Sequence, residues 1–467
     1  MKHKVVRISR RKFLKKSIAS VMLINMLCMS SLPLVVLAEG EATTKKEVTA
    51  TDATKAVTPS KAVKIPDVKS LGLQVKSAVL IEPTTGEILL SVNSDVALPP
   101  ASMTKMMTEY IVADQVKQGK LKWDDIVTVR QNAEETVGSR IFLAAGDQHT
   151  VEELYIAMAV GSANDATVAL AEHVAGSEAA FVQMMNEQAK RMGMKTAFFI
   201  NSSGLSRADM PADFRPNEDR ETVMSAMDAA LLAKFIVQDH PDFARFTAIQ
   251  SYPFRKRDSK PIINYNWMLE ANKDITNFKA YAYPGLDGLK TGHTLAAGNC
   301  FAGTAERDGM RLISVVMGAK TNAARFVETK KVLDYGYNNF EIKQVVAPKT
   351  VVVGTETVPV KKGVETTVGV VSDLDVKFMV PKGTQNPAIT SKVTLLNKDE
   401  LVAPLAKGTK VGTITYTYKA EGMSEAQEKT VNLVTADEVE KGGWFRLLFR
   451  AIKDLFVDLF DGIKNLF

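Results

Sequence analysis

Strand-forming runs lie on both sides of a long helix-rich stretch in this chain. The segment VKSAVLIEPTTGEILLSVN at 75–93 holds two apolar runs around Pro83-Thr84-Thr85-Gly86, which indicates a hairpin. Between about 103 and 240 apolar residues recur at i, i+3 and i+4, as in VEELYIAMAVG, which is typical of helices. Strand-like runs return near 288 as GLKTGHT, GNCFAGTAE and MRLISVVMGA. The fold class is therefore α+β, and the early and late strands are expected to share one sheet.

The pattern of the chain changes at about 343. Short runs rich in valine and threonine, among them VKFMVP, AITSKVTLL and KVGTITYTYKA, are separated by Gly, Pro and Asn. This is the pattern of a small all-β domain, and no ionisable cluster in it suggests chemistry. We expect an α+β domain over 69–342 and an all-β domain, acting as a spacer, over 343–436. A solvated linker rich in Thr, Ala, Lys and Glu is expected at 39–68.

The first 38 residues have the features of an export signal. Eight basic residues and no acidic one precede an apolar run from Ile18 to Leu37, which is interrupted by Asn25. Val36-Leu37-Ala38 then places small residues where a signal peptidase cleaves, so a signal peptide is expected over 1–38. The alternative is an N-terminal anchor that stays attached. The run SRRKFLK at 9–15 also resembles a twin-arginine motif, so the export route stays open.

Removal of this signal changes the charge balance. The whole chain has 59 basic and 53 acidic side chains, and loss of the signal leaves 51 basic residues and a net charge of about −2. The basic excess therefore says nothing about nucleic acid, and no such partner is expected. Only Cys300 remains, which excludes an internal disulfide, and the five histidines are scattered. We expect no metal site and no cofactor.

The segment at 444–467, WFRLLFRAIKDLFVDLFDGIKNLF, has the pattern of an amphipathic helix. On a helical wheel its polar residues gather in an arc of about 140°, and the rest of the wheel is apolar and aromatic. The seven charges exclude a spanning helix, so we expect an amphipathic helix that lies in one leaflet. The alternative is a terminal helix packed on its own domain. An exported protein held peripherally at the outer face of the cytoplasmic membrane follows from these two ends.

A first candidate for chemistry is the stretch ASMTKMM at 101–107. Pro99-Pro100 stops the chain before it, and the methionines that follow give a buried helical face. Ser102 is expected in the first turn of that helix, with Lys105 one turn further on the same side. A desolvated lysine amine there can act as a general base toward the serine hydroxyl. A capping serine beside a surface lysine is the alternative, and Ser9 to Lys12 fits the same short pattern.

Two further stretches can converge on this pair. Ser162 and Asn164 lie at the junction of two expected helices, where Ser162 could pass a proton and Asn164 could hold a substrate amide; a helix cap is the alternative. Lys290-Thr291-Gly292-His293-Thr294 lies on an expected strand whose edge could pair with an extended peptide. Gly292 would let a ligand approach the backbone, and Lys290 and Thr291 suit a substrate carboxylate.

The three motifs occur in the order found in penicillin-binding proteins and serine β-lactamases. With PASMTKMMT, NSSGL and DGLKTGHTLAAGNC, the chain from about 70 to its end resembles a low-molecular-mass penicillin-binding protein. The similar family is that of the D-alanyl-D-alanine carboxypeptidases with an added β-domain and a C-terminal amphipathic anchor. The resemblance implies a serine β-lactamase/penicillin-binding transpeptidase-like fold for 69–342, with a sheet flanked by helices.

The resemblance also implies roles for the motif residues. Ser102 would be the acylated nucleophile, Lys105 its base, and Ser162 and Asn164 the second element. Lys290, Thr291 and Gly292 would form the third wall, and the N–H groups of Ser102 and His293 an oxyanion hole. Arg325 in MGAKTNAARF would lie near the substrate carboxylate. The implied reaction is removal of the terminal D-alanine from peptidoglycan stem pentapeptides, with β-lactams acylating the same serine.

Three other functions use some of the same sequence features. A class A β-lactamase needs a deacylating glutamate, but no acidic residue lies between Glu187 and Asp209, and the second motif is Ser-Ala-Asn. A cross-link endopeptidase uses the same acyl chemistry and stays open. A membrane-surface cell-wall binding protein without catalysis is disfavoured by the intact motif set. The sequence leaves open a vegetative or sporulation role, the residue at stem position three and the oligomeric state.

Overall fold

The computed structural model describes residues 64–421 and 426–464. The expected signal peptide at 1–38 and most of the expected linker at 39–68 lie outside these residues. The first described domain is built on a five-stranded antiparallel sheet with the order β2-β1-β9-β8-β7. Its strands are β1 (Ser77–Glu82), β2 (Glu87–Val92), β7 (Leu286–Thr294), β8 (Gly298–Arg307) and β9 (Met310–Ala319).

The hairpin and the shared sheet predicted from the sequence are both confirmed. β1 and β2 pair across the turn that contains Gly86, and β1 pairs on its other side with β9, with Ser77 opposite Met317. The strands that precede the helical stretch therefore pair with the strands that follow it, in one sheet. β7 is one of the two edge strands, because only β8 pairs with it among the strands described.

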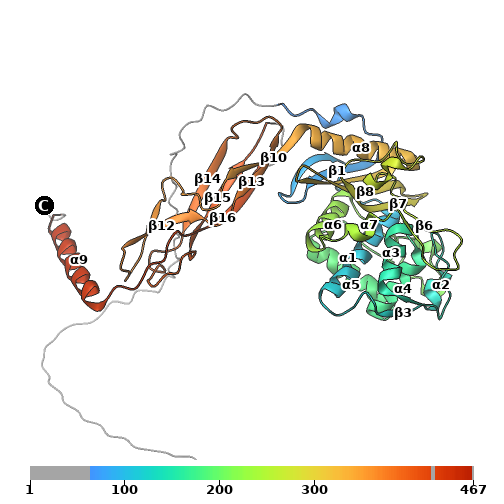
Figure 1. The fold of residues 1–467 in the computed structure, drawn as a ribbon, viewed down its shortest axis with the longest axis horizontal. Helices are drawn as coiled ribbons and strands as arrows, with labels where there is room; N and C mark the ends of the chain where they lie inside the picture. The colour runs from blue at the N-terminus through green and yellow to red at the C-terminus, as the bar shows by residue number, and fades with distance from the viewer. Residues whose placement is uncertain (1–63, 422–425, 465–467) are drawn as a thin grey trace, which may run out of the picture. The chain divides into compact units, whose positions relative to one another are not determined.

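Both faces of this sheet are buried, and alternate residues of each strand point to opposite faces. Val79 and Val315 point into a core that includes helices α1 and α6, whereas Leu80 and Val316 point into a core formed with α8. Figure 1 shows α8 on one side of the sheet and α6 on the other. The helices of this domain are α1 (Lys105–Lys117), α2 (Gln131–Glu135), α3 (Val151–Gly161), α4 (Asn164–Ala175), α5 (Glu178–Met192), α6 (Ala226–Asp239), α7 (Ala244–Thr247) and α8 (Asn322–Asn339). Short strand pairs β3 (Ile126–Thr128) with β4 (Gln148–Thr150) and β5 (Ser251–Tyr252) with β6 (Ile262–Ile263) complete it.

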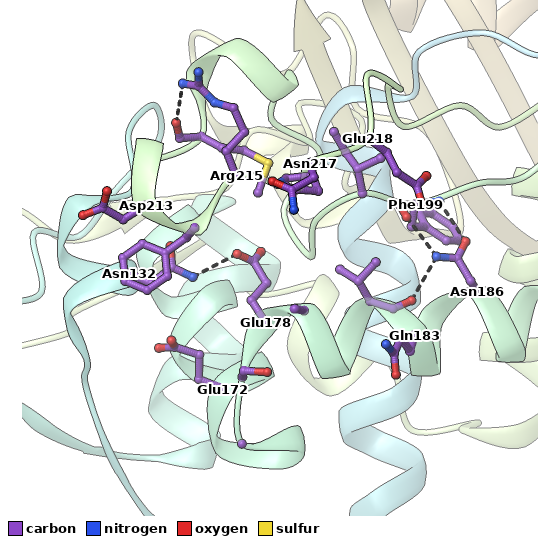
Figure 2. Close-up of a pocket in the computed structure, with 18 of the residues that line it drawn as sticks. Asn132, Glu172, Glu178, Gln183, Asn186, Phe199, Asp213, Arg215, Asn217 and Glu218 are labelled. Carbon is purple, nitrogen blue, oxygen red and sulfur yellow. Dashed lines mark hydrogen bonds between the residues drawn. The ribbon is translucent and has the colours of Figure 1, made fainter.

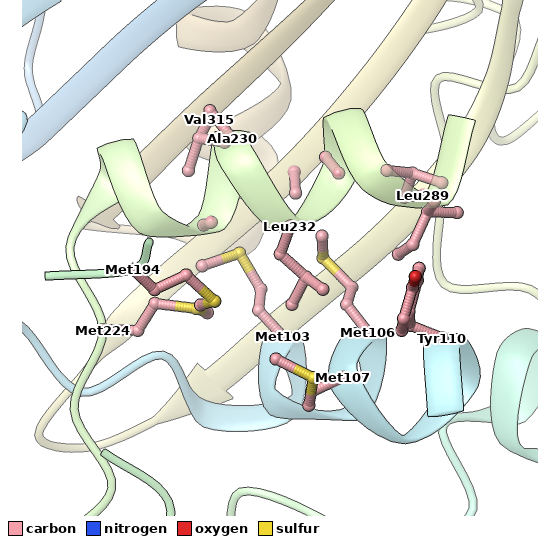
Figure 3. Packing of buried hydrophobic residues seen from close by; sticks show 14 of the residues in the cluster. Met103, Met106, Met107, Tyr110, Met194, Met224, Ala230, Leu232, Leu289 and Val315 are labelled. Atoms are coloured by element: carbon pink, nitrogen blue, oxygen red, sulfur yellow. The ribbon is translucent and has the colours of Figure 1, made fainter. Parts of the chain in front are cut away.

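The core under α1 is rich in methionine. Met103, Met106 and Met107 are fully buried and pack toward Leu232 of α6 and Met224, as Figure 3 shows. Because unbranched methionine side chains fill irregular gaps, this core adapts to the turn that precedes α1. A separate core, which includes Leu154 of α3, joins α3 and α4. The first turn of α1 packs into the methionine-rich core, and Val112 further along the helix belongs to the core of α3 and α4.

The second described domain is all-β, as expected. It contains a two-stranded sheet β10-β13 and a five-stranded sheet with the order β11-β12-β16-β15-β14. The strands are β10 (Phe340–Val346), β11 (Thr357–Pro359), β12 (Thr367–Ser372), β13 (Val376–Pro381), β14 (Ile389–Leu395), β15 (Lys410–Tyr418) and β16 (Gln427–Thr435). β10 follows α8 directly, so this strand pairing begins a little before the expected position 343.

The last element that the structure describes is the helix α9 (Trp444–Lys464). Most of the apolar side chains described on this helix are exposed, with Phe449 at 69% and Phe456 at 65%. Two residues of its polar face instead contact the all-β domain: Arg446 and Arg450 donate hydrogen bonds to the backbone carbonyl of Val364. Within the described part of the chain, no helix combines the length and apolarity needed to cross a membrane.

Candidate active site

Ser102 lies in a short 3₁₀ turn, η2 (Ala101–Thr104), rather than in the first turn of α1 as the sequence suggested. The chain enters this turn from Pro100 and passes through Ala101 with a positive φ of 50°. Such a backbone is costly for a residue with a Cβ and is kept only where the surroundings enforce it. The turn leaves Ser102 partly accessible while its neighbours Met103 and Thr104 are fully buried. Ser102 is therefore presented at a surface by a buried support.

Lys105 is the first residue of α1, and its side chain is fully buried. Its Nζ donates to Ser102 Oγ at 3.1 Å, to Asn164 Oδ1 at 2.7 Å and to the backbone oxygen of Ser203 at 2.7 Å. Two residues of the first motif and one of the second thus meet at a single nitrogen. The surface-lysine alternative for this motif is excluded by the burial.

The contacts of Lys105 also fix the direction of its lone pair. Burial, followed by repulsion from Lys290, lowers the pKa of Lys105 well below its ordinary value; the carboxylates of Glu109, Asp165 and Glu178 oppose this shift. A neutral amine has two N–H groups, and the two short contacts to Asn164 Oδ1 and Ser203 O use both. In this neutral form the 3.1 Å contact is reversed: the Ser102 hydroxyl donates and the lone pair of Lys105 Nζ accepts, which is the geometry a general base needs.

Ser162 and Asn164 lie at the junction of α3 and α4, as predicted. Ser162 ends α3 in the left-handed region with a φ of 54°, and its buried Oγ has no hydrogen-bond partner among the described residues. Asn164 begins α4, and its Nδ2 donates to the backbone oxygen of Val137 at 2.6 Å. Because this amide nitrogen is held by a carbonyl, Oδ1 must point the other way, toward Lys105. A helix cap does not account for either side chain.

The third motif lies on β7, an edge strand, which makes pairing with an extended peptide sterically possible. Lys290 is 2% exposed and Thr291 is 6% exposed. Gly292 does not face empty space: a Cβ there would lie 2.5 Å from the backbone oxygen of Pro100 and 3.2 Å from Met103 N. The glycine is needed because the strand presses against the Ser102 turn, a different reason from the ligand approach predicted from the sequence.

Arg325 and His293 are the outer members of the expected set. Arg325 comes from α8, is 4% exposed, and donates from Nη1 to the backbone oxygen of Gly292 at 3.2 Å. Burial lowers the pKa of Arg325 to about 10. The His293 side chain is exposed, with Nδ1 3.4 Å from the backbone oxygen of Gly298. Its expected contribution is a backbone N–H, which is independent of that side chain.

Two features of the site were not assigned from the sequence. The first is the loop NSSGL, where the Ser203 carbonyl accepts from Lys105 and the side chain of Asn201 receives the Gly204 N–H at 2.7 Å. Gly204 has a φ of +86°, and a Cβ there would lie 2.0 Å from the backbone oxygen of Ala101. The loop is thereby locked against the Ser102 turn. A backbone acceptor leaves no mark on residue type, so this role has no sequence signal.

The second is Glu109, one turn after Lys105 on α1. It is 2% exposed, and its Oε1 has no hydrogen-bond partner in the part of the chain that the structure describes. Burial raises the pKa of Glu109, while the positive charges of Lys290 and Lys105 lower it. Burial lowers the pKa of Lys290 and the charge of Glu109 opposes this. Glu109 is thus a buried counter-charge shared by the two lysines of the site.

Comparison with known proteins agrees with this geometry. Residues 61–321 match the family described as D-alanyl-D-alanine carboxypeptidase, and residues 340–441 match the C-terminal domain of penicillin-binding protein 5. The chain belongs to the D-alanyl-D-alanine carboxypeptidase family. D-alanyl-D-alanine carboxypeptidase DacF of Bacillus subtilis is 32% identical over 384 residues, which cover 82% of this chain and 90% of that protein.

Solved structures of this family share the fold. Penicillin-binding protein 5 of Haemophilus influenzae is 31% identical, with a TM-score of 0.63 over 81% of this chain and 100% of that one. A peptidoglycan synthesis regulatory factor, PBP3, of Streptococcus pneumoniae is 29% identical, with a TM-score of 0.67 over 79% of this chain and 100% of that one. These similarities confirm the predicted fold class, an α+β domain of the penicillin-binding type followed by an all-β domain.

Proposed function

We propose that this protein is a serine-type D-Ala-D-Ala carboxypeptidase that removes the terminal D-alanine from peptidoglycan stem pentapeptides. The observation that carries the proposal is the buried Lys105 amine, 3.1 Å from Ser102 Oγ and fixed by two acceptors at 2.7 Å. A buried base aimed at a serine hydroxyl in an accessible turn is the arrangement of an activated nucleophile. Family membership supports D-alanyl-D-alanine as the substrate.

In the acylation step, Ser102 Oγ attacks the carbonyl carbon between the two D-alanines. Its proton passes to Lys105 Nζ, and the carbonyl oxygen becomes an oxyanion that the N–H groups of Ser102 and His293 stabilise. When the tetrahedral intermediate collapses, the C–N bond breaks and the leaving nitrogen takes a proton from Lys105 through Ser162 Oγ. D-alanine departs, and the shortened stem remains esterified to Ser102.

Substrate binding is assigned to the opposite wall. The stem peptide would extend along the free edge of β7, with its terminal carboxylate toward Lys290, Thr291 and Arg325. The Asn164 amide would face the peptide backbone at the far side of Ser102. Deacylation uses water in place of D-alanine, with Lys105 again accepting the proton. A β-lactam would acylate Ser102 in the same way and leave slowly, because its ring-opened amine stays attached and hinders that water.

The test is release of D-alanine from diacetyl-L-lysyl-D-alanyl-D-alanine by the protein and by its Ser102→Ala form. Release by the first alone supports both the reaction and the nucleophile. If no D-alanine is released while a fluorescent penicillin still labels Ser102, the activity is that of a cross-link endopeptidase or a stricter peptidase. Labelling that survives Ser102→Ala contradicts the assignment of the nucleophile.

We further propose that residues 1–38 are an export signal, 39–68 a linker, 69–342 the catalytic domain, 343–436 a spacer, and 444–467 a peripheral membrane anchor. The exposed apolar side chains of α9, with Arg446 and Arg450 turned to the all-β domain, support the anchor. The protein would then act at the outer face of the cytoplasmic membrane. Deleting 444–467 should release it from membranes without loss of penicillin labelling; continued membrane fractionation contradicts the anchor.

A further inference from the structure

The loop at 137–143, between α2 and β4, runs past the start of α4 and is held there by Asn164 and the residue after it. The Asn164 side chain donates from Nδ2 to Val137 O at 2.6 Å, and its backbone N–H donates to Ser139 O at 2.7 Å. The same carboxamide presents Oδ1 to Lys105. The orientation of the carboxamide therefore depends on where this loop lies.

The next residue, Asp165, holds the second half of the loop through its carboxylate. Oδ2 accepts from Ile141 N and from Leu143 N, each at 3.1 Å, and Oδ1 accepts from Ala166 N at 2.9 Å. Asp165 is 0% exposed, and its hydrogen-bond partners among the described residues are all backbone N–H groups. Burial raises the pKa of Asp165, and the N–H groups of Leu143 and Ile141 have the largest opposing effects. The loop is thus the main stabilising partner of this buried carboxylate.

The backbone of the loop is shaped around this carboxylate. Phe142, between the two donors, has a φ of +59°, and its side chain is 71% exposed. A left-handed residue allows the N–H groups on its two sides to converge on one anion, but for a phenylalanine this backbone is unfavourable without such a partner. Arg255 supports the same arrangement, since it donates to the carbonyls of Ile141 and Phe142. Without the Asp165 charge the loop would lose the group around which it is folded.

The other acceptor of Lys105 is supported in the same way. Glu178 is 7% exposed and accepts from Ser202 N at 2.9 Å and from Ser202 Oγ at 2.6 Å, and the next residue, Ser203, supplies the carbonyl that holds Lys105. The second carboxylate oxygen of Glu178 accepts from Asn132 Nδ2 at 3.0 Å, as Figure 2 shows. A buried carboxylate thus supports each of the two groups that accept from Lys105.

Charge alone does not explain why carboxylates occupy these two positions. Asp165 and Glu178 both raise the pKa of Lys105 and so oppose the neutral form that a general base requires. Their hydrogen bonds to the backbone of the two loops are therefore the contribution that favours the reaction.

We propose that Asp165 is a positioning residue for the acylation of Ser102, which acts through the loop at 137–143 and the carboxamide of Asn164. This inference rests on the proposed function and adds a residue that belongs to none of its motifs. If the loop loosens, the Asn164 carboxamide can rotate, and Lys105 loses one of the two acceptors that direct its lone pair. A displacement of about 1 Å in a reacting group lowers a rate by up to about 100-fold.

The test is the second-order rate constant for labelling of Ser102 by a fluorescent penicillin, with the full chain in nanodiscs of zwitterionic lipid. The rate is measured on the high-pH plateau of each variant, where Lys105 is neutral and a changed pKa no longer alters the fraction of base. Asp165→Asn should lower the rate about tenfold or more, because a neutral amide holds the two N–H groups less strongly.

Asp147→Asn is the matched control. Asp147 also accepts a backbone N–H, that of Ala144 at 3.1 Å, but this contact lies beyond the part of the loop that holds Asn164. The variant therefore loses a carboxylate of the same kind without loosening the carboxamide, and it should be labelled at the native rate.

A double-mutant cycle with Asn164→Ala separates positioning from a general loss of stability. In the Asn164→Ala background the group through which Asp165 acts is absent, so Asp165→Asn should change the rate by about twofold or less. A loss of stability would instead lower the rate by the same factor in both backgrounds. If Asp165→Asn does not fold, as judged by denaturant titration, Arg255→Gln releases the same loop and replaces it in the cycle.

A native rate in the loop variant, or an equal loss in both backgrounds, overturns the proposal. So does a loss of the same size in Asp147→Asn. If the native chain is not labelled at all, the proposed function fails and this inference fails with it. That result is distinct from the others, because each of them requires a labelled native chain.

Discussion

Replacing Asn164 by aspartate tests whether Lys105 is the base, because it changes one atom and adds one charge. In the native chain the neutral Oδ1 lies 2.7 Å from Lys105 Nζ. A carboxylate oxygen at that position stabilises the ammonium form, and an opposite charge this close raises a pKa by about 1 to 3. A raised pKa means that the amine stays protonated to higher pH and cannot accept the Ser102 proton there.

The sign of the expected effect follows from this. If Lys105 is the base, acylation requires its neutral form, so the rate rises with pH through the pKa of that amine. Asn164→Asp should move this rise to higher pH by about 1 to 3, and lower the rate at pH values below it by about 10- to 1000-fold. The assay is the second-order rate constant of labelling by a fluorescent penicillin, measured across the pH range in which the chain stays folded.

A matched control separates the charge from the lost hydrogen bond. Asn164→Ala removes the contacts to Lys105 and to Val137 without adding charge, so it should lower the rate but not move the rise to higher pH. Both variants leave the Val137 carbonyl without its donor, at a cost of about 1–3 kcal/mol in the free energy of unfolding, measured by denaturant titration. An Asn164→Asp profile that overlays the native one would refute the role of Lys105 as base.

Three further predictions concern neighbouring parts of the molecule. Glu109→Gln removes the carboxylate that raises the pKa of both lysines, so the rise of penicillin labelling with pH should move to lower pH, and an unmoved rise contradicts the shared counter-charge. Gly292→Ala places a Cβ 2.5 Å from the Pro100 oxygen, so it should separate β7 from the Ser102 turn. The free energy of unfolding should fall by about 1–3 kcal/mol, and the rate of D-alanine release should fall with it. Native activity in the variant would contradict the need for a glycine at this contact. Phe449→Glu with Phe456→Glu should release the chain from lipid vesicles at unchanged penicillin labelling, whereas unchanged sedimentation with the vesicles contradicts insertion of α9.

The parts of the fold that could be predicted from the sequence are those specified by patterns of neighbouring residues. The hairpin around Gly86, the helix junction at Ser162 and the edge strand with Lys290 all depend on short-range patterns. One strand, β16, was not predicted as a separate run, because charged and polar residues dominate its first half and only Val431 and Leu433 alternate inward at its centre. Its place between β12 and β15 is set by pairing with distant strands.

The missing parts of the site share a different cause. Glu109 follows Lys105 by four positions, a spacing that on most helices is a surface ion pair, and only the tertiary fold buries it. Ser203 acts through its carbonyl, which every residue type possesses. Gly292 was noticed for its type, but the atom that requires it, the Pro100 oxygen, comes from a segment far away in the sequence. In each case the decisive partner is one that only the folded chain brings near.

The balance of buried charge gives an independent reason for a neutral Lys105. Lys105, Lys290 and Arg325 are all at most 4% exposed. Glu109 is the carboxylate that most raises the pKa of each of the two lysines. If all three basic groups were charged, Glu109 would offset part of the charge of both lysines, and Asp165 and Glu178 would add smaller contributions at Lys105. Desolvation makes the remaining buried positive charge costly. In the proposed mechanism, release of the Lys105 proton removes one positive charge and creates the base. A substrate carboxylate bound at Lys290 and Arg325 would offset part of the remaining positive charge, so that binding of the stem peptide and readiness of the nucleophile would depend on the same charge balance.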